Sequence, residues 1–313
     1  MNRWINNKLA FVLFICLLGS LGANIFLFIK TGSYKRQQLN TTNNLLLGEN
    51  EFVDDDADYI LHFQPLKQYI NLYLEDINNK QNKIAIYLQS LKSGAWLGVN
   101  ETEEFTPASL LKVPIAMAVL KNVEEGRLNL DDVSEVIISD IENEKQKDSP
   151  LTIGIKLTIR DQLQWMLTHS NNTAKNMLWR QLKTEDLARV FVHIGVPDPY
   201  LQFSSKKIST RGYTRIFKSL YFSTYLTREH SALILSDLTD ARAENLLAFG
   251  VPWEIQVAHK YGESEGSIHD CGIVYLPHNP YVLCLMTQNI EPSQAISVIQ
   301  DISSLVYKFA SQE

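Results

Sequence analysis

A serine and a lysine three positions apart stand before a long apolar run in the first half of the chain. They are Ser109 and Lys112, in the stretch PASLLKVPIAMAVLKNVEEG. Pro107 and the apolar run predict a helix that begins near Ser109, which places the lysine one turn further along the same face. A serine hydroxyl is a weak nucleophile until a base takes its proton, and a lysine amine within reach can be that base. The pair therefore predicts a nucleophilic serine.

This spacing alone is weak evidence, because the chain contains it twice. Residues 204 to 207 read Ser-Ser-Lys-Lys and lie in a polar stretch with no predicted helix start. We interpret this second copy, which begins at Ser204, as solvated surface.

A second polar triplet, Ser170-Asn171-Asn172, lies between two helical patterns. Thr158 and Asp161 have the spacing of a capping box for the first of these helices. Ser170 then falls in the turn between the helices, where a side chain can face a cleft. The alternative is that Asn171 or Asn172 only caps the second helix.

The third triplet, Lys260-Tyr261-Gly262, ends a predicted strand, and by itself it is also consistent with an ordinary strand end. In this order the three triplets resemble the S-x-x-K, S-x-N and K-[TS]-G motifs of the penicillin-recognising serine hydrolases, which are the class A β-lactamases and the penicillin-binding proteins. The resemblance extends from about Asp58 to Glu313. It implies a β-lactamase/transpeptidase-like fold, with a five-stranded antiparallel sheet flanked by helices and an inserted all-helical lobe.

The resemblance also implies a role for each matching residue. Ser109 would be acylated, Lys112 would accept or relay its proton, and Ser170 would pass a proton to the leaving nitrogen. Asn172 would hold the substrate amide. Lys260 would add positive charge for the substrate carboxylate and support Ser170.

The strand end that includes Gly262 is expected to line the substrate site. The backbone N–H groups of Ser109 and Glu263 would form the oxyanion hole, which stabilises charge that develops during acyl transfer. Tyr261 departs from the family pattern, because its ring stands where the family has a small hydroxyl residue that helps to bind the substrate carboxylate. The preferred substrate is therefore left open.

A second departure concerns deacylation. Between Asp186 and Asp237 the chain has no counterpart of the E-x-x-L-N loop whose glutamate activates the deacylating water in class A enzymes, and its acids there are Asp198 and Glu229. Without a positioned base the acyl-enzyme should be long-lived, as in a penicillin-binding protein. The alternative is that Lys112 serves as the base in both steps.

Three functions are consistent with these residues. The first is a β-lactamase-like hydrolase, and the second is a D,D-peptidase that acts on peptidoglycan stem peptides ending in D-Ala-D-Ala. The third is a non-catalytic wall-binding or sensor module, which Tyr261 and the absent glutamate favour and which the intact motifs oppose. No cofactor is implied.

A rival nucleophile lies near the third triplet. Residues 262 to 266 fit the G-x-S-x-G elbow of α/β-hydrolases around Ser264, with His269 and Asp270 nearby. The elbow requires a helix after the serine, whereas here another strand is predicted, so we interpret the segment as a hairpin turn. The histidines show no metal-binding spacing.

The elements that must position these residues follow an α+β order. Apolar alternation predicts two strands near the start of the domain and three near its end. The stretch between the two strand groups, residues 107 to 250, is mainly helical in pattern, so the strands must meet in one sheet with a helical lobe inserted. The predicted strands are 83–91, 94–100, 254–262, 267–276 and 281–288, and the predicted flanking helices are 58–80 and 293–309.

The first residues of the chain predict a membrane anchor. Residues 9–29 carry no charge, and as a helix they would match a hydrocarbon core of about 30 Å. A cleaved signal peptide is the alternative. We expect a cytoplasmic tail over residues 1–8, a polar linker over 30–57, and a catalytic domain over 58–313 outside the cytoplasm at the cell membrane.

Charge and cysteine content add two further expectations. The net charge of −6 argues against a nucleic-acid partner. Cys271 and Cys284 flank a predicted hairpin, where a disulfide is possible, although two unpaired thiols on neighbouring strands are the favoured interpretation.

Overall fold

A computed structural model of the chain describes residues 63–75, 77, 82–141, 150–196, 207–241 and 245–312. The predicted tail, anchor and linker over residues 1–57 lie outside these described residues, as do Asp198 and Ser204. Within the described residues, no helix is both long enough and apolar enough to cross a membrane.

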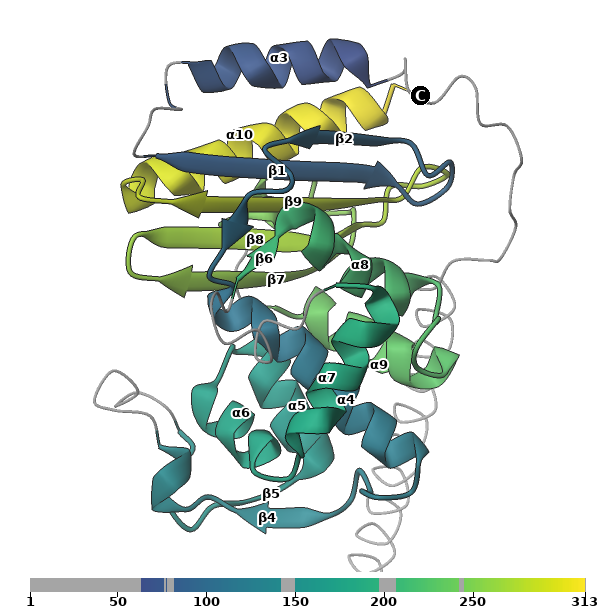
Figure 1. Cartoon of the computed structure of the whole chain (residues 1–313), viewed down its shortest axis with the longest axis vertical. Helices are drawn as coiled ribbons and strands as arrows, with labels where there is room; N and C mark the ends of the chain where they lie inside the picture. The colour runs from purple at the N-terminus through teal and green to yellow at the C-terminus, as the bar shows by residue number, and fades with distance from the viewer. Residues whose placement is uncertain are drawn as a thin grey trace, which may run out of the picture. The chain divides into compact units, whose positions relative to one another are not determined.

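Strands from the two ends of the domain form one antiparallel sheet in the order β2-β1-β9-β8-β7 (Figure 1). This confirms the predicted five-stranded sheet and its pairing of early with late strands. The strands are β1 (Lys83–Ser90), β2 (Trp96–Val99), β7 (Val257–Ser264), β8 (Ser267–Val274) and β9 (Tyr281–Gln288).

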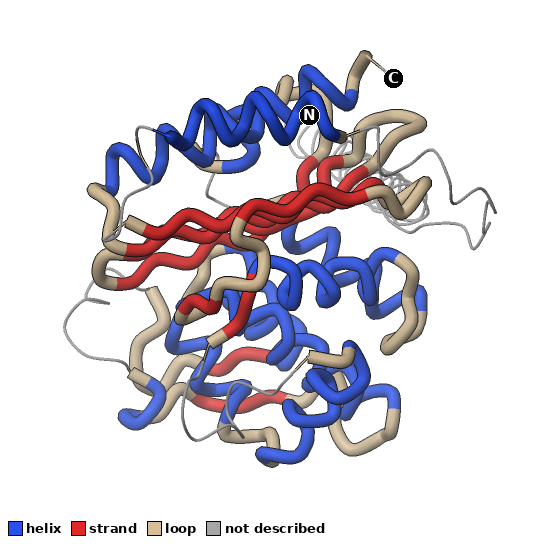
Figure 2. The backbone as a smooth tube through the Cα atoms, turned by 45° about the horizontal axis from the view of Figure 1, so that its top comes forward, coloured by secondary structure: helices blue, strands red, loops and turns tan. Residues whose placement is uncertain are grey.

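The sheet is covered on both faces, and its residues alternate between two cores. Leu283 and Leu285 pack with α3 (Gln64–Glu75) and α10 (Pro292–Ala310), which cover one face (Figure 2). The next residue in each case, Cys284 or Met286, packs into the core under the helical lobe. This alternation follows from the two-residue period of a strand. With a core on each face, nearly every residue of the central strands β1, β8 and β9 is buried.

The helical lobe occupies the other face of the sheet and is built around one buried helix. Ten of the thirteen residues of α4 (Lys112–Glu124) are buried, so this helix is apolar on nearly all sides. The remaining helical elements are η1 (Ala108–Leu111), η2 (Ile138–Asp140), α5 (Ile159–Thr168), α6 (Asn172–Trp179), α7 (Thr184–Ile194), α8 (Thr210–Tyr221), α9 (Arg228–Thr239) and η4 (Leu247–Gly250). Two short ladders pair β3 (Glu104–Phe105) with β6 (Ile208–Ser209), and β4 (Val133–Glu135) with β5 (Lys156–Thr158).

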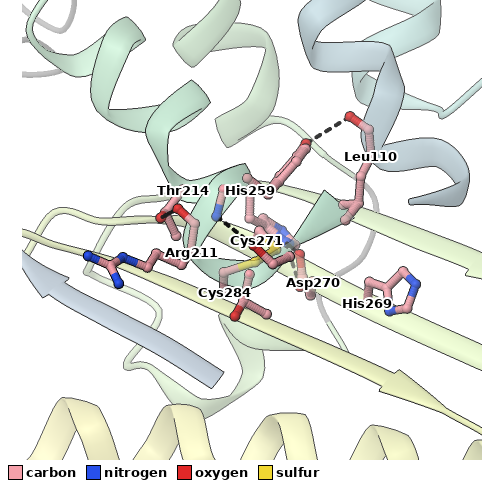
Figure 3. Close-up of a disulfide and its surroundings, with 12 residues drawn as sticks. Leu110, Arg211, Thr214, His259, His269, Asp270, Cys271 and Cys284 are labelled. Carbon is pink, nitrogen blue, oxygen red and sulfur yellow. Dashed lines mark hydrogen bonds and ion pairs between the residues drawn. A yellow bond between two sulfur atoms is a disulfide. The ribbon is translucent and has the colours of Figure 1, made fainter. Parts of the chain in front are cut away.

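The two cysteines of the sheet form a disulfide, so the favoured interpretation of unpaired thiols was wrong (Figure 3). Cys271 on β8 lies directly opposite Cys284 on β9, with a Cα to Cα distance of 3.9 Å. Both side chains are fully buried. The pairing depends on the register between the two strands, which the spacing of the cysteines does not fix.

Candidate active site

Ser109 lies in the short turn η1 that leads directly into α4, which confirms the predicted helix start. The residue before it, Ala108, has a φ of +49°, in the left-handed region that residues with a side chain seldom adopt. Backbone in such conformations is concentrated at functional sites, where the surrounding structure holds it. Ser109 itself is partly exposed.

The side chain of Lys112 is buried and reaches three residues of the predicted site. Its Nζ lies 3.0 Å from Ser109 Oγ, 3.0 Å from Ser170 Oγ and 2.6 Å from Asn172 Oδ1. It also donates to the Ser170 carbonyl. Two motifs that are about sixty residues apart in the sequence therefore meet at one nitrogen atom.

The turn between α5 and α6 presents Ser170 to this nitrogen. Thr158 accepts a hydrogen bond from the N–H of Asp161, as the predicted capping box requires. Ser170 has a φ of +53°. Asn171 caps α6 by accepting from a backbone N–H, whereas Asn172 points to Lys112. Asn171 therefore caps the helix, and its neighbour Asn172 contacts the site lysine.

Two buried side chains hold the backbone on either side of Ser109. The hydroxyl of Tyr213 on α8 donates to the carbonyl of Leu110 at 2.8 Å (Figure 3). His269 on β8 donates from Nε2 to the carbonyl of Thr106 at 2.9 Å. Its Nδ1 accepts from a backbone N–H of β9, and burial lowers the pKa of His269, so the ring is neutral.

These supports have no local motif in the sequence. Tyr213 is part of the buried face of α8, and its type alone does not distinguish a core residue from a supporting one. His269 was considered only as a neighbour of the rival serine Ser264. Their roles depend on tertiary contacts that sequence spacing does not reveal.

Gly262 allows β7 to approach the turn that carries Ser109. A Cβ atom at this position would lie 2.9 Å from the carbonyl oxygen of Pro107 and 3.4 Å from the nitrogen of Leu110. Only glycine fits without displacing backbone. The following residue, Glu263, is exposed, and its strand β7 lies at the edge of the sheet in contact with η1.

Lys260 contributes to the site differently from the expectation that it supports Ser170 directly. Its Nζ donates to the carbonyl of Tyr261 at 3.2 Å and lies 4.2 Å from the centre of the Tyr261 ring. Tyr261 lies close enough to Ser170 for that serine to lower the pKa of the tyrosine, although burial is the larger influence and raises it. The tyrosine thus stands between the two residues that were expected to meet.

The rival serine is in a hairpin turn, as predicted. Ser264 is the last residue of β7, is exposed and pairs with Ser267 at the start of β8. Gly266, with a φ of +70°, completes the turn. Asp270 accepts a hydrogen bond from His259 at 2.8 Å and another from the N–H of Leu247 (Figure 3). These hydrogen bonds connect β8 to β7 and η4, and they do not involve Ser264.

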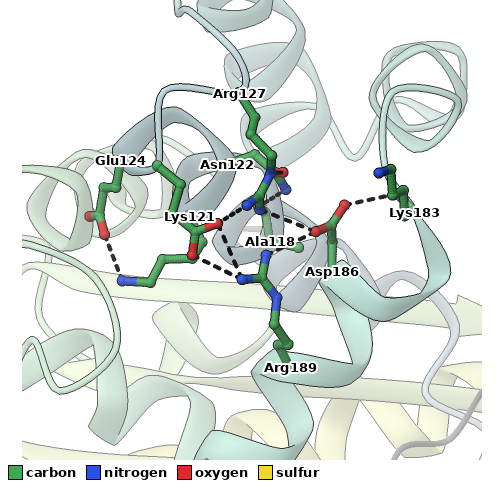
Figure 4. Close-up of polar contacts among 9 residues, drawn as sticks. Ala118, Lys121, Asn122, Glu124, Arg127, Lys183, Asp186 and Arg189 are labelled. Atoms are coloured by element: carbon green, nitrogen blue, oxygen red, sulfur yellow. Dashed lines mark hydrogen bonds and ion pairs between the residues drawn. The ribbon is translucent and has the colours of Figure 1, made fainter.

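The end of α4 that is remote from Ser109 is fixed by a charged network (Figure 4). Arg127, which follows this helix, lies 3.3 Å from Asp186 on α7. Arg189 bridges Asp186 at 2.9 Å and Glu125 at 2.9 Å. These ion pairs join α7 to the segment that ends α4, so the helix that carries Lys112 is held at both ends.

Comparisons with known proteins identify the family of the chain. Residues 65–310 match the Beta-lactamase enzyme family. The chain is 21% identical over 243 residues to the Extended-spectrum beta-lactamase PER-1 of Pseudomonas aeruginosa, and this alignment covers 67% of this chain and 77% of that protein. It is 22% identical to a Beta-lactamase of Phocaeicola vulgatus, which covers 68% of this chain and 76% of that protein.

Solved structures share the fold. A mutant of PBP-A in an acyl-enzyme complex with penicillin G is 25% identical, with a TM-score of 0.68 over 80% of this chain and 97% of that one. The TLA-1 extended spectrum beta-lactamase is 19% identical, with a TM-score of 0.70 over 80% of this chain and 99% of that one.

Proposed function

The chain belongs to the Beta-lactamase enzyme family and is a serine hydrolase, and from this premise we propose that it reacts with β-lactams through an acyl-enzyme on Ser109. The observation that supports this proposal most directly is the 3.0 Å distance between Lys112 Nζ and Ser109 Oγ. A nucleophile and its base must lie within hydrogen-bonding distance, and these two do.

Proton transfer follows from the partners of Lys112. Four oxygen atoms surround Lys112 Nζ. An ammonium group at this position has three N–H donors and no acceptor, whereas a neutral amine has a lone pair that can accept a proton. The Ser109 proton moves to this lone pair while Oγ bonds to the substrate carbonyl carbon. Ser170 then gives its proton to the leaving nitrogen as the C–N bond breaks, and it regains one from Lys112.

Charge that develops on the carbonyl oxygen is stabilised by the N–H groups of Ser109 and Glu263. The close approach of Gly262 to the Pro107 carbonyl supports this assignment, because it brings β7 against the turn η1. Asn172 holds the substrate amide. Backbone donors aimed at such an oxyanion are often the largest single contribution to acyl transfer.

We further propose that deacylation is the slow step. Between Asp186 and Asp237 the chain has no counterpart of the E-x-x-L-N loop, and loss of one general base costs about a hundredfold to ten-thousandfold in rate. A chromogenic cephalosporin is therefore expected to give a burst equal to the enzyme concentration, followed by slow turnover. The measurement is single-turnover against steady-state hydrolysis.

Rapid steady-state hydrolysis with no accumulated acyl-enzyme would contradict slow deacylation. If that turnover were lost in Asp198→Asn, the aspartate would be the base. The same absence of the loop favours a second candidate function, a D,D-peptidase that acts on peptidoglycan stem peptides.

We also propose that residues 9–29 anchor the chain in the cell membrane with the catalytic domain outside the cytoplasm. The uncharged run of this segment supports the anchor, and β-lactams and peptidoglycan are met outside the cytoplasm. A reporter fused after Glu313 should be active only when it is exported. Activity of a cytoplasmic reporter at that position would overturn the topology.

A further inference from the structure

Tyr261 occupies the space between a buried lysine and the proton-donating serine of the site. Its ring covers Lys260 Nζ at 4.2 Å, a distance at which a cation is attracted to the face of an aromatic ring. It also lies close enough to Ser170 for that serine to lower the pKa of the tyrosine, against the larger, raising effect of burial. One tyrosine side chain therefore lies beside both Ser170 and Lys260, the lysine that the family resemblance assigns to the substrate carboxylate.

The lysine beneath this ring is poorly placed to bind an anion. Lys260 is fully buried, and its ammonium already donates to the Tyr261 carbonyl. Burial lowers the pKa of Lys260 to about 7, against the opposing charge of Asp270. Near neutral pH, Lys260 is therefore charged in only about half of the molecules.

Among the described residues of β7 and the turn after it, the exposed ionisable side chains are acidic, namely Glu263 and Glu265. Glu263 is exposed and lies two residues beyond Tyr261, close enough for its charge to raise the pKa of the tyrosine, although burial is the larger cause. Lys112 is turned toward Ser109, Ser170 and Asn172. A substrate carboxylate near Tyr261 would thus meet a phenol ring and an acidic side chain.

We propose that Tyr261 closes the carboxylate subsite, so that the enzyme prefers acyl donors whose leaving amine carries a neutral group, such as an ester or an amide. This inference rests on the proposed acylation of Ser109. It also argues against the second candidate function, the D,D-peptidase, because the leaving amine of a stem peptide that ends in D-Ala-D-Ala carries a free carboxylate.

Benzylpenicillin and its methyl ester test the inference, since they differ in this carboxylate alone. The second-order rate constant for covalent modification is measured for each by intact-protein mass spectrometry. We expect the full chain to react with the ester at least as fast as with the acid. In Tyr261→Ser the acid-to-ester ratio should rise about tenfold, the size expected for one charge-assisted contact.

Two further variants separate the ring from other effects. Tyr261→Phe keeps the ring over Lys260 and should keep the ratio of the natural chain. Tyr69→Ser removes an exposed tyrosine of α3 and should also leave the ratio unchanged. The thermal unfolding midpoint of each variant is compared with that of the natural chain, and equal midpoints show that the variants fold.

The following results would overturn the inference. A natural chain that prefers the acid by tenfold or more, or a Tyr261→Ser ratio that does not rise, would overturn the role of Tyr261 while leaving acylation of Ser109 intact. Absence of reaction with both compounds would overturn the proposed function itself, and this inference with it.

Discussion

Replacing Ser109 with alanine is expected to abolish covalent modification by penicillin and to lower kcat/KM for a chromogenic cephalosporin by about a thousandfold or more. The reason is geometric, because the Ser109 hydroxyl lies 3.0 Å from Lys112 Nζ. Removal of this oxygen leaves the base without a nucleophile to activate. Any residual hydrolysis would come from bound water, aided by the oxyanion donors.

Ser264→Ala is the matched control for this change. Ser264 is the exposed last residue of β7, next to a hairpin turn, and its loss should leave the modification rate unchanged. If modification were lost in Ser264→Ala and kept in Ser109→Ala, Ser264 would be the nucleophile.

The second large effect is expected for Lys112→Met, which should slow acylation by about a hundredfold to ten-thousandfold. Methionine fills a similar volume in the buried site but cannot accept the Ser109 proton. It also leaves the Ser170 carbonyl and Asn172 without their donor. Stopped-flow measurement of the acylation burst gives the rate.

Lys92→Met, in the exposed turn after β1, is the control for loss of a lysine. Thermal unfolding of both variants separates a slower reaction from a damaged fold. An unchanged acylation rate in a folded Lys112→Met variant would assign the base to another group.

The fold could be predicted because its strands are marked by apolar alternation and stand at the two ends of the domain. The inserted lobe followed from the helical pattern between them, and α4 could be recognised as central from its unbroken apolar run. The pairing of Ser109 with Lys112 could be predicted from their spacing at a helix start, whereas their meeting with Ser170 was implied by the resemblance of the three motifs to those of penicillin-recognising serine hydrolases.

The features that the sequence did not reveal depend on contacts between distant segments. The disulfide between Cys271 and Cys284 requires the register of β8 against β9. Tyr213 supports the carbonyl of Leu110 across 103 residues of chain. Lys260 was expected to reach Ser170, but the ring of Tyr261 lies between them, and no pattern of residue types gives the direction of a side chain.

Peptide mapping after treatment with a labelled penicillin tests the central claim most directly. The full chain is digested, and the labelled peptide is identified by mass spectrometry, with Ser109→Ala as the blank. We predict one adduct, on the peptide that contains Ser109, with the mass of an opened β-lactam. An adduct on any other serine, or no adduct while the cephalosporin is still hydrolysed, would contradict it.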